Sequence, residues 1–298
     1  IHQQMKRIVL LLLFATVLFS CKQGKVYYEE RGSVFHTYYR IKYQSEEPLT
    51  DKIDKELQAF NLSLNPFNPN SIVAKVNRNE DVEVEPWFTD VFNKAMLVAE
   101  QSDGAFDVTA APFINLWGFG LERKDNVSVQ VIDSMKAFVG YRKIRLDGNR
   151  VVKDDPRTLL NFSAIAKGYA SDVIAALLER EGVENYMVMI GGEATVKGVN
   201  PNSRCWQIAI DKPVGDQIIK PEDDQTTTNN KYQEIVGLCN PCGMATSGNY
   251  RNFYVKDGKK YAHTIDPRTG YPSEQNILSA TVIASNCMTA DAYATAFM

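Results

Sequence analysis

The sequence is short of several residue types and motifs, and each shortage excludes a class of protein. Its five cysteines are too few to hold a chain of 298 residues as a disulfide scaffold. Lys and Arg (33) almost balance Asp and Glu (36) and form no long basic block, so we expect no nucleic-acid partner. No GxGxxG and no GxxxxGK(S/T) pattern occurs, which speaks against a Rossmann nucleotide site and a P-loop. Apolar residues, at 44%, are frequent enough for one sizeable globular domain.

The amino-terminal residues predict export and a lipid anchor. A charged start at residues 5–7 precedes an uninterrupted apolar run over residues 8–19, shorter than the about 20 residues that a membrane span needs. The end of this run resembles the bacterial lipobox, in which the cysteine, here Cys21, becomes the acylated first residue of the mature protein. We therefore expect residues 1–20 to be a signal peptide, with residues 1–4 upstream of the initiator. Cys21 would hold the protein on the periplasmic side of the bacterial cell envelope, and an ordinary signal or a short anchor is the alternative.

Hydrophobic periodicity predicts a chain in which helices and strands mix. Apolar residues at helical spacing cover residues 49–61, 86–102 and 167–181, and runs rich in aromatic and β-branched residues predict strands over residues 34–43 and 186–190. We also expect a loop at residues 65–70, a hairpin of residues 250–255 and 260–265, and a polar surface insertion around residues 216–234. An α+β domain, with an antiparallel or mixed sheet covered by helices, fits this pattern better than a doubly wound parallel fold.

The cysteines that follow Cys21 offer one short motif. Cys239 and Cys242 have CxxC spacing, but no second CxxC and no nearby histidine pair completes a zinc site. A redox or disulfide role is one interpretation of this pair. The favoured interpretation is two ordinary cysteines at strand ends.

Histidine is scarce, which narrows the search for chemistry. The chain has three histidines: His2 lies in the upstream residues and His36 in a predicted strand, so only His263 stands beside unusual residues. It opens the run His-Thr-Ile-Asp-Pro-Arg-Thr-Gly, which leads from a strand into a turn, where positioned functional groups often lie. Taken alone, this run is better explained as a turn whose Asp and Thr cap their own backbone.

Two other patterns could bind a ligand. Gly191 and Gly192 follow a predicted apolar strand, and glycines let a backbone approach a flat or phosphorylated ligand. Asp291 and Thr295 lie four apart in a predicted helix with Thr289 as its cap, so they share one face. Carboxylate and hydroxyl oxygens suit Mg²⁺ better than zinc, although a solvated helix face would show the same spacing.

Several motifs in one order strongly resemble the ApbE family of FAD:protein FMN transferases. The resemblance covers the chain from about Val34 to its end, and HTIDPRTG is its most specific part. The motifs are residues 107–109 with 115–120, 161–168 (NFSAIAKG), 191–193 (GGE), 245–250 (ATSGNY), 263–270 (HTIDPRTG) and 291–295 (DAYAT).

The resemblance implies an α+β fold that binds FAD with Mg²⁺ and transfers FMN to a Ser or Thr hydroxyl of an exported or membrane flavoprotein, releasing AMP. It implies metal ligation by the backbone carbonyl of Ala164 and by the side chains of Asp291 and Thr295. His263 is the candidate base for the acceptor hydroxyl. The residues expected to bind FAD are Phe67, Ser163, Lys167, Gly191, Gly192, Glu193, Ser247, His263, Ile265, Asp266 and Thr269. Lys167 could instead serve an internal ion pair.

The chain departs from the family pattern at a few positions. Asn161 stands where the family usually has Asp, and Phe35-His36-Thr37 stands where Met-Gly-Thr is common. The sequence ends at Met298, inside what we expect to be a continuing helix and strand, which puts the anchoring of Asp291 and Thr295 in question. The alternative functions are an FAD pyrophosphatase that releases FMN and AMP, and a flavin-binding lipoprotein without chemistry.

Overall fold

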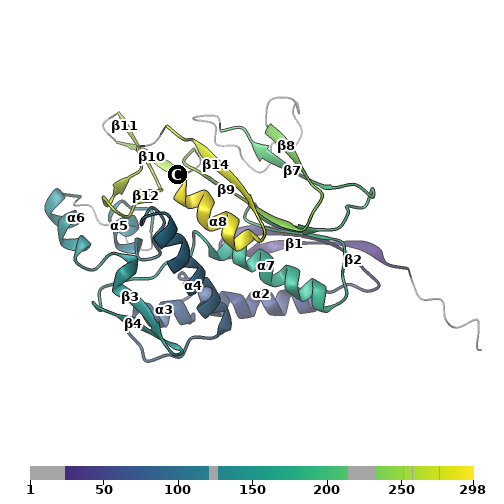
Figure 1. Ribbon diagram of the computed structural model, residues 1–298, viewed down its shortest axis with the longest axis horizontal. Helices are drawn as coiled ribbons and strands as arrows, with labels where there is room; N and C mark the ends of the chain where they lie inside the picture. The colour runs from purple at the N-terminus through teal and green to yellow at the C-terminus, as the bar shows by residue number, and fades with distance from the viewer. Residues whose placement is uncertain (1–23, 121–126, 214–231, 251, 257, 275) are drawn as a thin grey trace, which may run out of the picture.

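A six-stranded antiparallel sheet forms the centre of the molecule (Figure 1). The computed structural model describes residues 24–120, 127–213, 232–250, 252–256, 258–274 and 276–298. In spatial order the strands are β1 (Val26–Val34), β2 (Thr37–Ser45), β5 (Tyr186–Ile190), β6 (Glu193–Lys197), β9 (Cys242–Gly248) and β14 (Ser279–Ala284). All neighbouring pairs are antiparallel. The predicted α+β class with an antiparallel sheet is confirmed.

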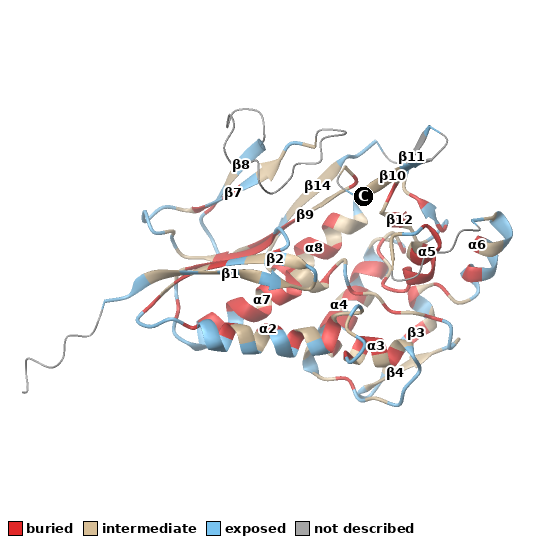
Figure 2. Cartoon of the chain, turned by 180° about the vertical axis from the view of Figure 1, so that it is seen from behind, coloured by how far each residue is buried: buried red, intermediate tan, exposed pale blue. Residues whose placement is uncertain are grey.

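Helices cover one face of this sheet and enclose the main core. The helices in the described residues are α2 (Thr50–Leu64), α3 (Ile72–Asn77), α4 (Pro86–Gln101), α5 (Ala111–Leu116), α6 (Val129–Lys136), α7 (Ala166–Arg180) and α8 (Cys287–Ala296). Ile41 of β2, Val188 of β5, Ile53 of α2 and Phe88 of α4 are fully buried in this one core. In Figure 2 the buried residues of α2, α4, α7 and α8 face the interior of the molecule. None of the helices in the described part of the chain has the length and apolar character needed to cross a membrane.

A two-stranded ribbon covers the other face of the sheet. It consists of β7 (Trp206–Asp211) and β8 (Tyr232–Leu238), and its Trp206 and Leu238 pack with Met187 and Met244 of the sheet. Trp206 pairs with Leu238, which brings the flanking Cys205 and Cys239 together in a disulfide. The prediction of two ordinary cysteines is therefore wrong for Cys239, whereas Cys242 is free. The sequence could not show this pairing because the two cysteines are 34 residues apart.

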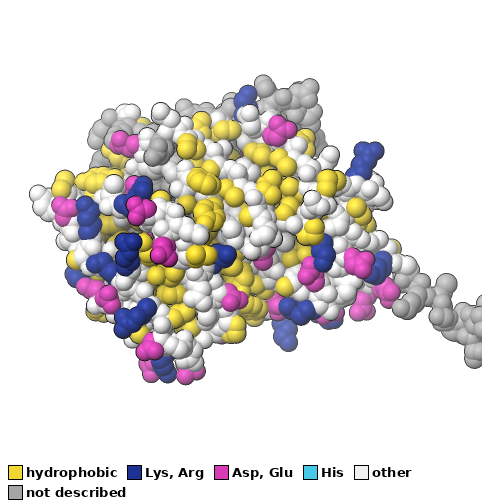
Figure 3. All heavy atoms as spheres, viewed as in Figure 1, with side chains coloured by type: hydrophobic (Ala, Val, Ile, Leu, Met, Phe, Trp, Pro, Cys, Tyr) yellow, Lys and Arg dark blue, Asp and Glu magenta, His cyan; other side chains and the backbone are white. Residues whose placement is uncertain are grey.

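Short hairpins complete the fold around the sheet. They are β3 (Ile144–Asp147) with β4 (Arg150–Lys153), β10 (Phe253–Lys256) with β11 (Lys259–Ala262), and β12 (Ile265–Asp266) with β13 (Tyr271–Pro272). The space-filling view shows acidic and basic side chains interspersed over one face, in line with the formal net charge of −3 (Figure 3). Exposed apolar side chains on the described surface include Ile283 of β14 and Phe297 beside α8.

Most predicted elements are confirmed, and two local predictions are wrong. The predicted strand over residues 34–43 is the end of β1 and most of β2, because the backbone turns at Phe35 and His36, where φ is +53° and +59°. His36 therefore lies in a hairpin turn rather than within a strand. Asn286, and not Thr289, caps α8: its side chain accepts a hydrogen bond from the Thr289 amide at 2.9 Å.

Three predicted features fall wholly or mainly outside the described residues. They are the export signal, the lipobox Cys21, and the polar insertion, of which only residues 232–234 are described, as the start of β8.

Candidate active site

A cavity of about 530 Å³ lies where the helices meet the ends of the central strands, and its size is in the range of small-molecule sites. Its walls come from the segments around α5, the turn before α7, the β5–β6 turn, β7, β9 and α8. Most of the predicted site residues line it, although they are far apart in the sequence. These are Phe67, Ser163, Ala164, Lys167, Gly191, Gly192, Glu193, Ser247, His263, Ile265, Asp291 and Thr295.

A cluster of one ammonium and two buried carboxylates lies in one wall of the cavity. The Lys167 ammonium is 2.9 Å from Glu193 Oε1 and 3.8 Å from Asp291 Oδ1. Burial alone would lower the pKa of Lys167, but the carboxylates of Asp291 and Glu193 outweigh it and raise that pKa. Burial raises the pKa of Asp291, which the nearby ammonium only partly offsets. One cation thus faces two buried carboxylates, and this site can accommodate more positive charge.

The three predicted metal ligands line the same cavity. Asp291 and Thr295 lie one turn apart on α8, and Ala164 lies in the turn that leads into α7. Within the described residues, no group of three or more His, Cys, Asp or Glu side chains could hold a metal ion. A cation here would therefore rely on one carboxylate together with hydroxyl and carbonyl oxygens. Hard oxygen donors of this kind fit Mg²⁺. The buried Asp291 carboxylate, which the Lys167 ammonium compensates only in part, would also favour a cation there.

Two glycines let α8 approach α7 and the sheet closely enough to place Asp291 at the cavity. A Cβ atom on Gly168 would come within 2.4 Å of the Cys287 carbonyl oxygen and 2.7 Å of Asp291 Cβ. A Cβ atom on Gly243 of β9 would come within 2.0 Å of the Cys287 amide nitrogen. The Gly168 amide also donates a hydrogen bond to Asp291 Oδ2 at 3.0 Å.

Asp172 does not line the cavity, but it holds the start of α8, and the sequence analysis missed it. Its carboxylate accepts hydrogen bonds from the amides of Cys287 (2.9 Å) and Met288 (2.8 Å), the first two residues of α8. Thr195 donates a third at 2.7 Å. A carboxylate at a helix N-terminus also interacts favourably with the helix dipole. The sequence offered one sign of this role: Asp172 is an acidic residue directly before Val173 and Ile174, two apolar residues that are buried in α7.

His263 lies at the cavity wall just beyond β11. Its backbone amide and its ring Nδ1 both approach the Asn252 carbonyl oxygen, at 3.1 Å and 3.2 Å. Because a carbonyl oxygen only accepts, this contact favours the proton on Nδ1 and leaves the lone pair on Nε2. Burial is the main cause of a lowered pKa for His263, and the positive charge of Lys167 acts in the same direction. The neutral ring can therefore act as a base near neutral pH.

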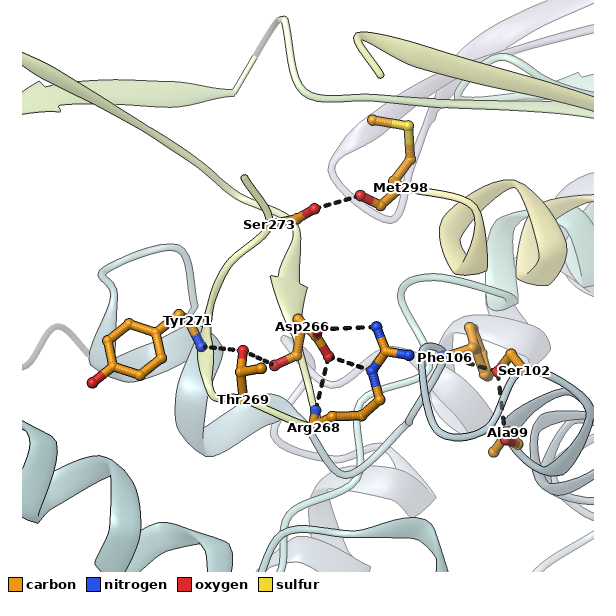
Figure 4. A network of polar contacts seen from close by, with 9 residues as sticks. All are labelled: Ala99, Ser102, Phe106, Asp266, Arg268, Thr269, Tyr271, Ser273 and Met298. Carbon is orange, nitrogen blue, oxygen red and sulfur yellow. Dashed lines mark hydrogen bonds and ion pairs between the residues drawn. The ribbon is translucent and has the colours of Figure 1, made fainter. Parts of the chain in front are cut away.

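Asp266 and Thr269 do not line the cavity, in contrast to the sequence prediction. Both Asp266 oxygens are bound by Arg268: Oδ1 accepts from the backbone amide and Nε at 2.9 Å, and Oδ2 accepts from Nη2 at 3.0 Å. The Thr269 hydroxyl donates to the Asp266 carbonyl and accepts from the Tyr271 amide (Figure 4). These two side chains hold the turn that follows His263 and Ile265.

The two glycines before Glu193 have a structural role as well as a place in the cavity wall. They form the two-residue turn between β5 and β6, with φ of +69° at Gly191 and +110° at Gly192. Side chains rarely adopt such angles, which explains the glycine pair without any ligand. The turn directs Glu193 into the cavity wall, where it is 4% exposed.

Phe67 lies between the main cavity and a smaller one of about 270 Å³. Its ring meets the His36 ring edge-on, with 5.4 Å between centroids. Ser163 and Lys167 also line both spaces. The turn that carries His36 therefore brings this histidine next to the predicted ligand site.

The sequence matches a family model and curated relatives over most of its length. The ApbE family model matches residues 35–298. The FAD:protein FMN transferase of Vibrio cholerae is 34% identical over 293 residues, covering 95% of this chain and 84% of that protein. The FAD:protein FMN transferase of Haemophilus influenzae is 34% identical over 304 residues, covering 96% and 84%.

Solved structures of flavin transferases have the same fold. The flavin transferase ApbE from Vibrio cholerae matches with a TM-score of 0.78 at 34% identity, covering 92% of this chain and 87% of that one. The apo form of the flavinyl transferase ApbE from Pseudomonas stutzeri matches with a TM-score of 0.78 at 30% identity, covering 92% and 84%. With the family model matching most of its length, the chain belongs to the ApbE family.

Proposed function

We propose that this protein transfers the FMN half of FAD to a Ser or Thr hydroxyl of an exported or membrane flavoprotein, with Mg²⁺, and releases AMP. The observation that carries the proposal is the meeting of three groups in one cavity. These are a histidine whose ring Nε2 carries the lone pair, a lysine ammonium in the cavity wall, and oxygen donors suited to a divalent cation. The relatives described above are named FAD:protein FMN transferases, which supports a transfer of FMN from FAD to a protein.

In this proposal Ala164, Asp291 and Thr295 hold Mg²⁺ through one carbonyl, one carboxylate and one hydroxyl oxygen. When bound, the ion would offset negative charge on the FAD pyrophosphate. Gly191 and Gly192 keep the backbone close to the ligand without side-chain bulk.

His263 is the group that moves a proton. Its Nε2 takes the proton from the acceptor hydroxyl as that oxygen forms a bond to the riboflavin-side phosphorus. The bond between this phosphorus and the bridging pyrophosphate oxygen breaks, and AMP leaves with the bonding electrons. Asn252 keeps the ring in the tautomer that this step requires.

The proposed location is the periplasmic side of the bacterial cell envelope, with Cys21 acylated. The support is the order of charged, apolar and small residues before Cys21. Cys21→Ser is expected to move the protein from the membrane fraction to the periplasmic extract. A variant that remains membrane-bound would contradict the lipid anchor.

The deciding experiment incubates the purified protein with FAD, Mg²⁺ and a fragment of an exported flavoprotein that carries a Ser or Thr flavinylation motif. Intact-mass and peptide mass spectrometry are expected to show an FMN-sized gain on that Ser or Thr. A chelator should abolish the gain.

Two other outcomes would contradict the transferase. Metal-dependent release of FMN and AMP without labelling of the acceptor would indicate an FAD pyrophosphatase. FAD binding without any product would indicate a flavin-binding lipoprotein.

A further inference from the structure

The Lys167 ammonium lies between two buried carboxylates but is not shared equally. It is 2.9 Å from Glu193 Oε1, a hydrogen-bond distance, and 3.8 Å from Asp291 Oδ1, which is too long for one. Both acids are 4% exposed. The ammonium is therefore bound by Glu193 and only attracted by Asp291.

Three neighbouring groups hold Lys167, Glu193 and Asp291 in this unequal arrangement. Glu193 Oε2 and Lys167 Cδ are the atoms nearest to a Cβ placed on Gly191, at 2.9 Å and 3.0 Å, so the pair packs against the β5–β6 turn. The Ser171 hydroxyl donates to the Glu193 carbonyl at 3.2 Å, which ties β6 to α7. On the opposite side, the Gly168 amide holds Asp291 Oδ2 at 3.0 Å.

Asp291 is left with one carboxylate oxygen that accepts no hydrogen bond from the described residues. This oxygen is the one that Lys167 would take if it left Glu193. An ammonium on Asp291 would occupy its oxygen and repel a divalent cation. Glu193 also keeps a second buried oxygen, Oε2, without a partner in the described chain, so it has spare capacity to retain the ammonium.

We propose that Glu193 is a positioning residue that retains the Lys167 ammonium and so keeps the Asp291 carboxylate free to bind a divalent cation. This inference deepens the proposed function, since it concerns the residues expected to hold Mg²⁺. Glu193 acts through Lys167 and not as a ligand of the ion. Removing its charge should therefore weaken metal binding strongly while Lys167 is present, and much less when Lys167 is absent.

The test is a double-mutant cycle on Mg²⁺ affinity, measured by isothermal titration calorimetry of the FAD-free protein. Glu193→Gln alone is expected to weaken Mg²⁺ binding at least tenfold. The same substitution in a Lys167→Met background is expected to weaken it less than threefold. Asp291→Asn should abolish the binding and so identify the site, and thermal melts should confirm that all variants fold.

A matched control is Glu179→Gln on α7, the helix that also carries Lys167. Glu179 pairs with Lys197 at 2.8 Å and lies outside the cavity lining, so its substitution should leave Mg²⁺ affinity unchanged. An equal loss from Glu193→Gln in both backgrounds would overturn the inference, because Glu193 would then act directly on the ion. A wild-type protein that takes up no Mg²⁺ would overturn it as well.

The proposed function is tested separately, by FAD binding measured through quenching of flavin fluorescence. Failure to bind FAD would contradict the proposed function, but the double-mutant cycle on Mg²⁺ affinity could still be interpreted. A normal FAD affinity with an equal loss in both backgrounds would contradict only the role of Glu193.

Discussion

His263 is the side chain on which the proposed chemistry depends most directly. His263→Gln keeps a polar side chain but removes the base, so transfer to the acceptor should slow by about 10²–10⁴-fold. FAD affinity should change little, because the ring is one of many groups in the cavity wall. Single-turnover labelling of the acceptor and flavin fluorescence measure the two quantities. An unchanged labelling rate would place the base elsewhere.

The same residue predicts a pH dependence with a definite sign. Burial lowers the pKa of His263 below its usual 6.5, and only the neutral ring can accept a proton. The labelling rate should therefore rise with pH through a midpoint below 6.5 and level off once the ring is fully neutral. A profile from about pH 5 to pH 8 tests this. His263→Gln should lose the slope, and a midpoint above 6.5 would contradict the assignment.

At the residue scale, the predicted site residues that line the cavity are those in the motifs whose side chains have no partner within a few residues in the sequence. His263, Lys167, Glu193 and Asp291 belong to this group. Asp266 fits the same motif, but its oxygens are taken by Arg268 two residues later, a contact that sequence alone could not weigh against a ligand. Asp172 carries no motif at all, because its partners are backbone amides of a helix 115 residues away.

At the scale of elements, the contact between α7 and α8 leaves no room for a side chain at Gly168. Gly168→Ala would press a Cβ against the Cys287 carbonyl at 2.4 Å, and the resulting shift should cost about 1–3 kcal/mol of stability. Because Asp291 Cβ is the next contact, Mg²⁺ affinity should fall as well. Urea unfolding and calorimetry measure the two effects.

The matched control for this substitution is Gly237→Ala on β8. A Cβ there meets no atom within 4 Å, so both stability and Mg²⁺ affinity should be nearly unchanged. If Gly168→Ala were as mild as Gly237→Ala, the close packing of α8 would not be what positions Asp291.

The disulfide between Cys205 and Cys239 closes the base of the β7–β8 ribbon. This ribbon contributes Ala209, Ile210 and Asp211 to the cavity wall. A cross-link over 34 residues restricts the unfolded chain, so Cys205→Ser should lower the free energy of unfolding by about 3–4 kcal/mol. Cys242→Ser, which removes a free thiol, is the control for the urea unfolding experiment. Equal stability of the two variants would contradict a role for the bridge.

Long amphipathic helices were predictable because their periodicity extends over several turns. The predicted helix at residues 49–61 is α2 (Thr50–Leu64), and the one at residues 86–102 is α4 (Pro86–Gln101). The β1–β2 hairpin was missed, since its turn residues Phe35 and His36 resemble strand residues and lack the usual glycine or asparagine. Local sequence carries strong signals for helices and weak ones for an atypical turn.

At the scale of the whole molecule, the order of strands brings the site together. β6 pairs with β9, and β9 with β14, so the turn before Glu193 lies close to Ser247 and to the helix that carries Asp291. Periodicity predicts single elements and contains no information on which distant strands pair. The family resemblance therefore indicated which residues to expect in the site, and the structure shows how those that line the cavity are arranged.

Because ligands would contact segments from all parts of the chain, their binding should stabilise the whole fold. A ligand at about one hundred times its dissociation constant adds about 2.7 kcal/mol to the free energy of unfolding. For a chain of this size we expect a rise of roughly 5 °C in melting temperature. His263→Gln is the variant to use, since FAD is then consumed slowly during the scan.

The metal makes this prediction specific to the charged cluster. FAD should raise the melting temperature more with Mg²⁺ than with chelator, because two carboxyl groups, of Asp291 and Glu193, face the single ammonium of Lys167, and the ion would add the positive charge that a pyrophosphate needs. Asp291→Asn should remove the difference between the two conditions, since it lacks the proposed metal carboxylate. If FAD gave the same shift with Mg²⁺ and with chelator, the ion would not contribute to holding the pyrophosphate. Without any shift, the cavity would not be an FAD site.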